Sequence, residues 1–416
     1  MSVYIIGTSC TRFGKRPDSS FKDLTREAFM GVVADAKLDD GHRIDSVWFS
    51  NCGMGTFGQR NIRGQVCLTP LVREGLFPQR VPVVNVEGGC ASGSMALNGA
   101  WKDVLAGTSD LALAIGVEKT FIAEDPSRVQ EIFEGGIDQF DRQEWMDYYK
   151  KAGEISGKPF EPNAAGGTVF MDTYAMQAAY HMKQHGTTQR QLAIAASKNH
   201  YQGSLNPLAQ YQFEVSVDEV LADRIVSYPL TRSMCAPIGD GAAAALICSE
   251  RFLRTLSPEQ QARAVKIRTS QLTGGMYRRL DEPGLSYVAA RKAYAHAGLT
   301  PQDVHLAEVH DATAFSEIYQ AEMMGFCPIG EGGKFVESGA TAQGGKLPIN
   351  MSGGLVSKGH PVGVTGLSMV YETALQLRGE AGKRQVEGAR IGLIENGGGV
   401  VGFDEAVCAV TLLEAS

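Results

Sequence analysis

The sequence contains two rounds of one pattern, in which a strand-like run ends in polar residues and a later one ends in paired glycines. IDSVWFSNCG begins at residue 44 and VHLAEVHDAT at residue 304, an offset of 260. VNVEGGCASG begins at residue 84 and INMSGGLVSKG at residue 349, an offset of 265. Strand-like and helix-like runs alternate in both rounds, which is typical of an α/β protein. Because the two offsets nearly agree, we predict a duplicated α/β half rather than a short solenoid repeat.

The duplication suggests how the chain of 416 residues is divided. We assign residues 1–120 and 170–260 to an N-terminal half, and residues 261–416 to a C-terminal half. The stretch 121–169 is polar and aromatic and lacks strand–helix alternation, so we predict an inserted loop domain there. Two similar halves should pack face to face, with the site near the carboxyl ends of their strands.

Charge and composition exclude several classes of protein. The net charge of −7 argues against a nucleic-acid surface, and no window reaches the length of a membrane span. The eight cysteines form no C-x-x-C pair and have no histidines at zinc spacing, so we expect reduced thiols and no metal. We therefore predict a cytoplasmic protein that binds neither nucleic acid nor membrane.

Cys90 stands in the run Gly-Gly-Cys-Ala-Ser-Gly, between a strand-like and a helix-like segment. The N-terminus of a helix lowers the pKa of a thiol, and small neighbours allow a carbonyl group to approach the sulfur. We predict a nucleophilic thiolate at Cys90, although a cysteine can also be a small buried residue.

Two histidines follow glycine-rich or strand-like runs in the second round. His360, between Gly359 and Pro361, can accept the thiol proton or donate to an oxyanion. His310 and Asp311 follow a strand. They could hold a water or an oxyanion, or form a helix-capping pair with Asp311 as the N-cap.

At these residues the sequence resembles the thiolase family. GGCASG (88–93), HDAT (310–313), GGLVSKGHPVGVTG (353–366) and a glycine-rich loop at 394–402 match four family motifs in order, over nearly the whole chain. The His-Asp pair, in place of Asn-Glu, is similar to the sterol-carrier-protein-X and archaeal branch. The resemblance implies the thiolase fold, with two duplicated α/β halves in α-β-α-β-α layers.

The resemblance also implies a mechanism. Cys90 would attack the keto carbon of a 3-oxoacyl-CoA, with His360 activating the thiol and a water near His310 binding the oxyanion. Free CoA, a co-substrate, would release the acyl group from Cys90, and no other cofactor is expected. The residues expected to bind the oxyanion or substrate are Asp311, Asn396, Gly397 and Gly398.

The sequence departs from the family at the second catalytic cysteine. The C-terminal loop has Glu395 where many thiolases have the cysteine of a Cys-x-Gly motif, and Ala312 stands where the sterol-carrier branch has a cysteine. The missing acid could be Glu395, His310, Asp311 or a water. Glu395 would need burial to raise its pKa, and the alternative is an exposed loop carboxylate.

The expected function is thiolysis of a bulky or aromatic acyl group in a degradation pathway, with benzoylsuccinyl-CoA as one specific hypothesis. Aromatic residues of the loop section could widen the pocket or simply pack: Phe121, Phe133, Phe140, Trp145, Tyr148 and Tyr149. The alternatives are a Claisen-type synthase and a degenerate scaffold that binds acyl-CoA. The resemblance further implies a homodimer and suggests a small zinc-ribbon and OB-fold subunit, giving a heterotetramer.

Overall fold

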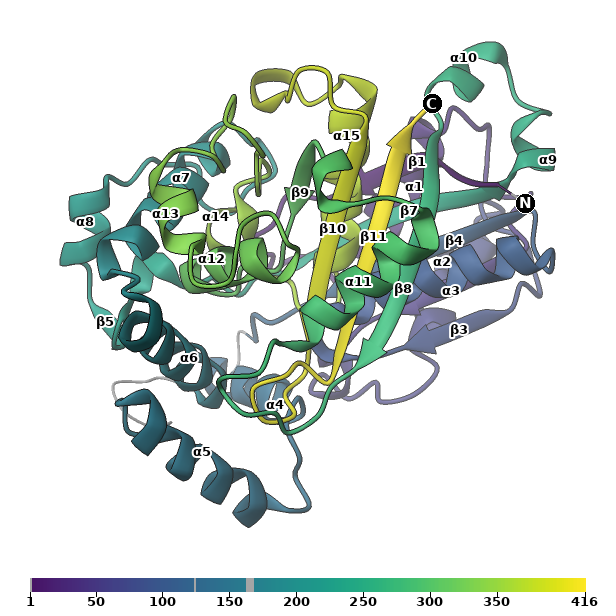
Figure 1. Cartoon of the computed structure of the whole chain (residues 1–416). Coiled ribbons are helices and arrows are strands. Elements are labelled where there is room, and N and C mark those ends of the chain that lie inside the picture. The colour runs from purple at the N-terminus through teal and green to yellow at the C-terminus, as the bar shows by residue number, and fades with distance from the viewer. Residues whose placement is uncertain (1, 123–124, 162–167) are drawn as a thin grey trace.

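One mixed sheet runs through the centre of the molecule, with helices on both of its faces (Figure 1). The computed structural model describes residues 2–122, 125–161 and 168–416, and within them the sheet has the strand order β3-β2-β4-β7-β1-β8-β11-β10-β9. The first five strands belong to the N-terminal half. The elements of that half are β1 (Val3–Cys10), α1 (Phe21–Asp35), β2 (Ser46–Ser50), α2 (Arg63–Arg73), β3 (Val83–Val86), α3 (Ser92–Ala106), β4 (Leu111–Glu118) and β7 (Gly241–Ser249).

The C-terminal half repeats this strand order. Its strands run β8-β11-β10-β9, and Ile349 extends the series through a parallel bridge to Ala307 of β9. The matching series in the first half is β1-β7-β4-β2-β3, so the predicted duplication is confirmed. The elements of the second half are β8 (Val265–Gly274), α11 (Leu285–Ala297), β9 (Leu306–Glu308), α12 (Ala314–Met323), α13 (Gly332–Glu337), α14 (Gly354–Lys358), α15 (Thr365–Arg378), β10 (Ile391–Gly398) and β11 (Val407–Ala415).

The half-sheets meet at β1 and β8, which pair antiparallel through Tyr4–Lys266 and Ile5–Val265. Alternate residues of β4 face opposite sides: Leu111 packs under α1, whereas Ala112 packs toward α3 and α15. Helices α3 and α15 lie between the half-sheets, while α1 with α2 and α11 cover the two outer faces. This is the predicted α-β-α-β-α layering.

The segment predicted as a loop insertion contains helices joined by turns. It contains α4 (Val129–Glu134) and α5 (Arg142–Ser156), while residues 162–167 lie outside the described part. Helix α5 packs on α6 (Val169–His185) at a distance from the sheet (Figure 1).

The aromatic residues of this segment do not form one pocket wall. Trp145, Tyr148 and Tyr149 pack with Phe403 as a small separate core, and Phe140 is fully exposed. For the four rings of the loop section among these, packing or solvent exposure takes the place of the suggested wide pocket.

The chain between α5 and β7 packs mainly on the second half. Helix α7 (Gln189–Ser204) contacts α12, α13 and α14, and only β7 of the stretch 170–260 joins the first half's sheet. The domain boundaries at 120, 170 and 260 therefore stay a prediction. The remaining elements are α8 (Val217–Ala222), β5 (Ile225–Ser227), β6 (Leu230–Thr231), α9 (Glu250–Leu253) and α10 (Pro258–Ala262).

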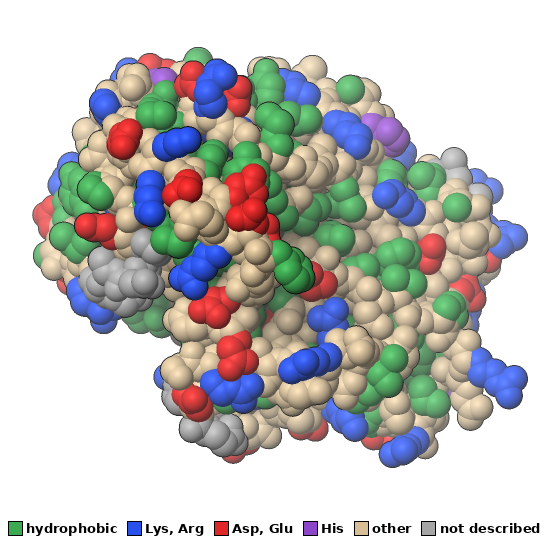
Figure 2. Space-filling model, turned by 90° about the horizontal axis from the view of Figure 1, so that it is seen from below, with side chains coloured by type: hydrophobic (Ala, Val, Ile, Leu, Met, Phe, Trp, Pro, Cys, Tyr) green, Lys and Arg blue, Asp and Glu red, His purple; other side chains and the backbone are tan. Residues whose placement is uncertain are grey.

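Acidic and basic side chains are interspersed on the face seen from below (Figure 2). That face therefore offers no single-sign patch of the kind that binds nucleic acid. Among the described helices, none combines the length and apolarity needed to cross a membrane.

Candidate active site

Cys90 lies on the turn that links β3 to α3. The turn is a short 3-10 helix, Gly89–Ala91, and α3 follows it directly. Gly89 has φ +56°, and a Cβ atom there would lie 2.5 Å from the backbone nitrogen of Gly399. Glycine is required before Cys90 because the left-handed backbone and the close second chain both exclude a side chain. The strand–turn–helix setting predicted for Cys90 is confirmed.

The sulfur of Cys90 contacts the imidazole of His360 from the other half. Cys90 Sγ lies 3.1 Å from His360 Nε2, and His360 Nδ1 lies 2.7 Å from Thr365 Oγ1. The Thr365 hydroxyl donates to the carbonyl of Pro361 at 3.1 Å, so it accepts from Nδ1–H. The Nε2 lone pair therefore faces the thiol, and the imidazole can accept the thiol proton.

Burial acts against charge on both members of the pair. Burial raises the pKa of the Cys90 thiol to about 12, and nearby carboxylates add to this rise. Burial also holds the pKa of His360 well below its usual value. Removal of water from the sulfur thus opposes the helix N-terminus, which favours a thiolate. The thiolate stays a prediction, and the contact allows transfer of the thiol proton to His360 during attack on a substrate.

His310 lies at the end of β9, beside His360. The two ring centroids are 5.4 Å apart, and the backbone N–H of His310 donates to Glu395 Oε2 at 3.0 Å. Its Nε2 is buried without a hydrogen-bond partner among the described residues, and burial lowers the pKa of the ring to about 4. A neutral ring nitrogen without a partner can take a water or a substrate oxygen.

Cys90, His310 and His360 converge closely. One ligand atom from each lies within 4.8 Å of the others. Over the described ranges, no other set of three His, Cys, Asp or Glu residues meets this limit. The spacing alone would suit a metal such as Zn²⁺, which binds thiolate sulfur and imidazole nitrogen. The expected absence of a metal stays a prediction.

Glu395 is fully buried in β10 and is not the exposed loop carboxylate of the alternative interpretation. Its Oε2 accepts from the His310 backbone, and its Oε1 lies 3.4 Å from Cys408 Sγ. Burial, followed by the charge of Glu405, raises the pKa of Glu395 to about 8. Glu395 therefore has the raised pKa that a proton donor near neutrality needs, while its role as the catalytic acid stays a prediction.

Asp311 braces the loops behind the site. Its Oδ1 accepts from the backbone N–H of Leu355 at 2.6 Å, and its Oδ2 accepts from Asn199 Nδ2 at 2.8 Å. The N-cap of α12 is Thr313, so Asp311 as the N-cap is wrong. Binding of substrate by Asp311 stays a prediction.

The glycine-rich end of β10 packs directly on the backbone of Cys90. A Cβ atom at Gly398 would stand 2.6 Å from the Cys90 nitrogen. Gly399 lines the cavity beside Cys90, whereas the side chain of Asn396 accepts from Ser94 Oγ at 2.9 Å and so turns toward α3. The arrangement brings peptide groups close to the sulfur, and an oxyanion site formed by the loop stays a prediction.

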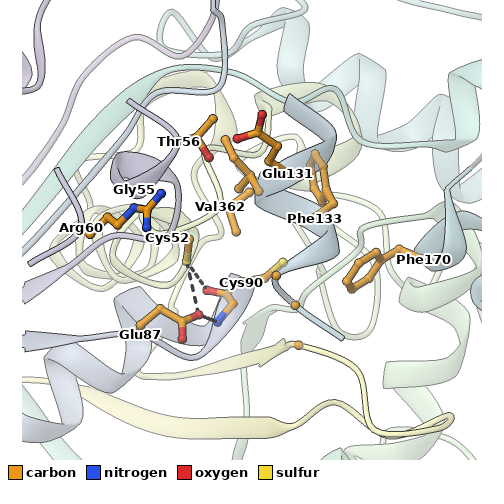
Figure 3. A pocket seen from close by; sticks show the side chains of 15 residues that line it. Cys52, Gly55, Thr56, Arg60, Glu87, Cys90, Glu131, Phe133, Phe170 and Val362 are labelled. Atoms are coloured by element: carbon orange, nitrogen blue, oxygen red, sulfur yellow. Dashed lines mark hydrogen bonds between the residues drawn. The ribbon is translucent and has the colours of Figure 1, made fainter. Parts of the chain in front are cut away.

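The thiol opens into a cavity of about 420 Å³. Arg60 and Thr56 lie on one side of Cys90, and Phe133 and Phe170 lie on the other (Figure 3). Phe133 belongs to the aromatic loop section, whereas sequence analysis missed Phe170, whose helical position gives no distinguishing signal.

Sequence analysis also missed Glu118, at the end of β4. Its carboxyl accepts backbone N–H bonds from Cys52 at 2.9 Å and from Gly53 and Gly363 at 3.0 Å each. Burial raises the pKa of Glu118 to about 7. Glu118 therefore ties the first half to the Gly-His-Pro turn of the second. A charged residue that ends an otherwise apolar strand was the available signal.

Family models cover most of the chain. Residues 3–251 match the model described as "Thiolase, N-terminal domain", and residues 286–410 match "Thiolase C-terminal domain-like".

Relatives align along nearly the full chain. The acetyl-CoA acetyltransferase of Methanothermobacter thermautotrophicus is 37% identical over 407 residues, covering 96% of this chain and 97% of that protein. Human sterol carrier protein 2 is 35% identical, over 97% of this chain and 73% of its own. Benzoylsuccinyl-CoA thiolase subunit BbsB of Thauera aromatica is 30% identical, over 92% and 91%.

A solved structure has the same fold. The structure titled "Ltp2-ChsH2(DUF35) aldolase" matches with a TM-score of 0.76 at 21% identity, covering 100% of this chain and 98% of that chain.

Proposed function

The chain belongs to the thiolase family and is an acyltransferase, and we propose that it cleaves a 3-oxoacyl-CoA with free CoA through an acyl-Cys90 intermediate. The observation that carries the proposal is the 3.1 Å contact between Cys90 Sγ and His360 Nε2. A thiol becomes an effective nucleophile when a positioned base takes its proton during attack. Thr365 supports this role of His360 by holding Nδ1–H away from the sulfur.

The first half-reaction forms the acyl-enzyme. His360 takes the thiol proton as Cys90 attacks the keto carbon, and the unpartnered Nε2 of His310 is available to the oxyanion directly or through a water. The backbone of Cys90 and the 397–399 loop would hold a second oxygen of the substrate. Cleavage between carbons two and three leaves acyl-Cys90 and an enolate of the shortened CoA thioester.

The second half-reaction restores the enzyme. The enolate takes a proton, for which Glu395 is our first candidate because its buried carboxyl has a pKa of about 8. CoA then attacks acyl-Cys90, and the protonated His360 returns its proton to the departing sulfur. CoA is thus a co-substrate, and no resident cofactor is needed for these steps.

The acyl group is proposed to be bulky or aromatic. Phe133 and Phe170 form an apolar side of the cavity beside Cys90, with their rings edge to face at 6.1 Å. Such a surface suits a flat apolar group. The similarity to a benzoylsuccinyl-CoA thiolase subunit supports the same substrate class.

The proposed assembly is a homodimer joined by a small zinc-ribbon and OB-fold subunit in a heterotetramer. The support is indirect: one relative is named as a subunit, and a structure with the same fold is titled as a complex with a DUF35 protein. A cytoplasmic location agrees with eight cysteines that are all free thiols.

Mass spectrometry of the intact protein after incubation with a panel of 3-oxoacyl-CoAs tests this function. We expect a retained acyl mass on the peptide that contains Cys90, removed on adding CoA. A panel that includes benzoylsuccinyl-CoA and acetoacetyl-CoA separates aromatic from short acyl groups. No retained mass with any member would contradict the thiolase reaction, and net condensation of two acyl-CoAs would identify a Claisen-type synthase.

A further inference from the structure

The connection between β10 and β11 folds Glu405 back onto β10. Val401 and Asp404 bond to each other across this tight turn, at 3.0 and 3.2 Å. The Cδ and Oε1 atoms of Glu405 lie 2.7 and 2.9 Å from the position that a Cβ atom at Gly397 would occupy. The absence of a side chain at Gly397 therefore makes room for the carboxyl of Glu405 against the strand.

Glu395 is on the same face of β10. Residues two apart on a strand point to the same side, so Glu395 and Gly397 share a face, and Glu405 covers that face. The carboxyls of Glu395 and Glu405 are therefore neighbours at the buried end of the strand. Their proximity makes it costly for both to be ionised at once.

No described residue forms an ion pair with either carboxyl. Arg278 lies near Glu405, but its Nε donates to Asp404 Oδ1 at 2.8 Å. Burial raises the pKa of Glu405 to about 7 and that of Glu395 to about 8, so the two titrate as a unit near neutrality. The other titratable groups around them are Tyr174, Asp311, Tyr319, Asp404 and Cys408.

Glu405 lies within electrostatic range of the nucleophile. Tyr174 is one helical turn beyond Phe170, so it continues the face of α6 that lines the cavity. After burial, the charges of Glu405, Cys90 and Glu395 all raise the pKa of the Tyr174 hydroxyl. Glu405 also contributes to the raised pKa of Cys90. Tyr174 is therefore within electrostatic range of both carboxyls and of Cys90.

We propose that Glu395 and Glu405 form a carboxyl pair that shares one proton and delivers it to the enolate carbon formed beside Cys90. The pair would replace the second cysteine that this chain lacks. This inference rests on the thiolase reaction proposed above, and it adds Glu405, which no sequence motif identified.

The two members of the pair have different surroundings. Glu395 is fully buried, with one oxygen bonded to the His310 backbone and the other in contact with the Cys408 thiol. Glu405 is only half-buried, and in the described part of the chain no other residue donates a hydrogen bond to its side chain. Glu405 is therefore the member that transfers the proton, and the transfer leaves both carboxyls ionised until the proton is replaced.

The proton balance closes over one turnover. In the first half-reaction the thiol proton moves to His360, the bond between carbons two and three breaks, and its electron pair goes to carbon two. The pair protonates that carbon and becomes doubly ionised. The protonated His360 then returns its proton to the pair. In the second half-reaction the neutral His360 takes the thiol proton of CoA as its sulfur attacks acyl-Cys90, and passes it to the released Cys90 sulfur.

The test separates acyl transfer from proton transfer to carbon in the Glu405→Gln variant. Acetyl-CoA is the probe for both measurements: mass spectrometry follows acetylation of Cys90, and proton NMR in D₂O follows exchange of the acetyl methyl protons. We expect acetylation within about twofold of wild type and methyl exchange reduced about a hundredfold, the usual contribution of one general acid–base group. Glu405→Asp, which keeps a carboxyl on a shorter stem, should recover part of the exchange.

Glu154→Gln, at an exposed position on α5, is the matched control and should leave both rates unchanged. Unchanged exchange in Glu405→Gln would overturn the carboxyl pair, as would equal loss of acetylation and exchange. A wild-type protein that cannot acylate Cys90 with any acyl-CoA would instead refute the thiolase function itself.

Discussion

In the N-terminal half, β3 runs directly into the Gly89–Ala91 turn and α3, and that turn carries Cys90. In the C-terminal half, Ile349 takes the place of β3, but α14 intervenes before His360 and α15. The longer connection carries an imidazole across to the sulfur of the first half. Duplication thus supplied two equivalent strand ends, and divergence of the connecting segments made them complementary.

Each half also has a buried glutamate on the equivalent strand, and the two glutamates differ in their hydrogen-bond partners. Glu118, at the end of β4, accepts three backbone N–H bonds and a fourth bond from Asn51 Nδ2 at 2.9 Å. Glu395, on the corresponding strand β10, accepts one backbone N–H and contacts one thiol. A carboxyl with four donors suits a structural brace, whereas one with few donors beside a second acid suits proton transfer.

Removal of the Cys90 sulfur should have the largest effect, because the imidazole of the second half then has no thiol to contact. We expect Cys90→Ala to lower CoA-dependent cleavage by at least about 10⁴-fold, because the covalent route is lost. Cys52→Ala removes the other sulfur that lines the cavity and should keep most of the activity. Comparable cleavage rates in the two variants would contradict the assignment of Cys90.

Removing the imidazole tests the contribution of the second half. His360→Ala should lower the cleavage rate by about 10²- to 10³-fold, the range for loss of a general base or oxyanion donor. Thr365→Val removes the partner of Nδ1 and should cost about tenfold, because the tautomer is no longer held. Initial rates measured against pH would check both, and a Thr365→Val profile identical to wild type would refute the tautomer argument.

Matched substitutions of Glu118 and Glu395 test whether the first is a structural brace and the second is an acid. Glu118→Gln should lower the free energy of unfolding by about 1–3 kcal/mol, because the new amide cannot accept all the buried donors. Glu395→Gln should change stability less and should slow methyl exchange more. Urea unfolding ranks the two variants by stability, and methyl exchange ranks them by proton transfer. If Glu395→Gln lost more stability and Glu118→Gln lost more exchange, the roles of brace and acid would be reversed.

The pH dependence of stability should reflect both carboxyls. Their pKa values of about 7 and about 8 lie above the ordinary glutamate value, so the folded chain holds more protons than the unfolded chain between about pH 4.5 and pH 8. This contribution therefore favours the folded state at low pH and is lost as pH rises through that window. In the Glu118→Gln variant, the free energy of unfolding measured with urea should fall less steeply as pH rises. A decline equal to that of the wild type would contradict the raised pKa of Glu118.

The smallest expected effect concerns the aromatic side of the cavity, to which neither duplicated sheet contributes. Phe170→Ala should raise KM for an aromatic acyl-CoA about five- to tenfold by removing part of a buried contact. KM for acetoacetyl-CoA should change little. Phe140→Ala, at a fully exposed ring, is the control. Equal effects on both substrates would refute the aromatic preference.

Much of the fold and part of the site could be predicted from local patterns. Cys90, His360 and His310 stand in short frames of glycine or at strand ends, where a backbone requirement is visible in the sequence itself. Glu405 could not be predicted, because its contact with Gly397 depends on how the β10–β11 turn folds back. Phe170 and Glu118 likewise acquire their contacts only when distant segments pack together.

The sequence by itself determined the duplicated α/β halves, the turn that carries Cys90 and the replacement of cysteine by Ala312 and Glu395 at two positions, since each follows from periodicity or residue identity. Only the tertiary structure decided that the thiol is buried against an imidazole, that Asp311 braces a loop, and that Glu405 folds back onto the strand that carries Glu395. The physical reason is that protonation and pairing depend on water exclusion and on distances across the fold, and both arise only when the halves close on each other.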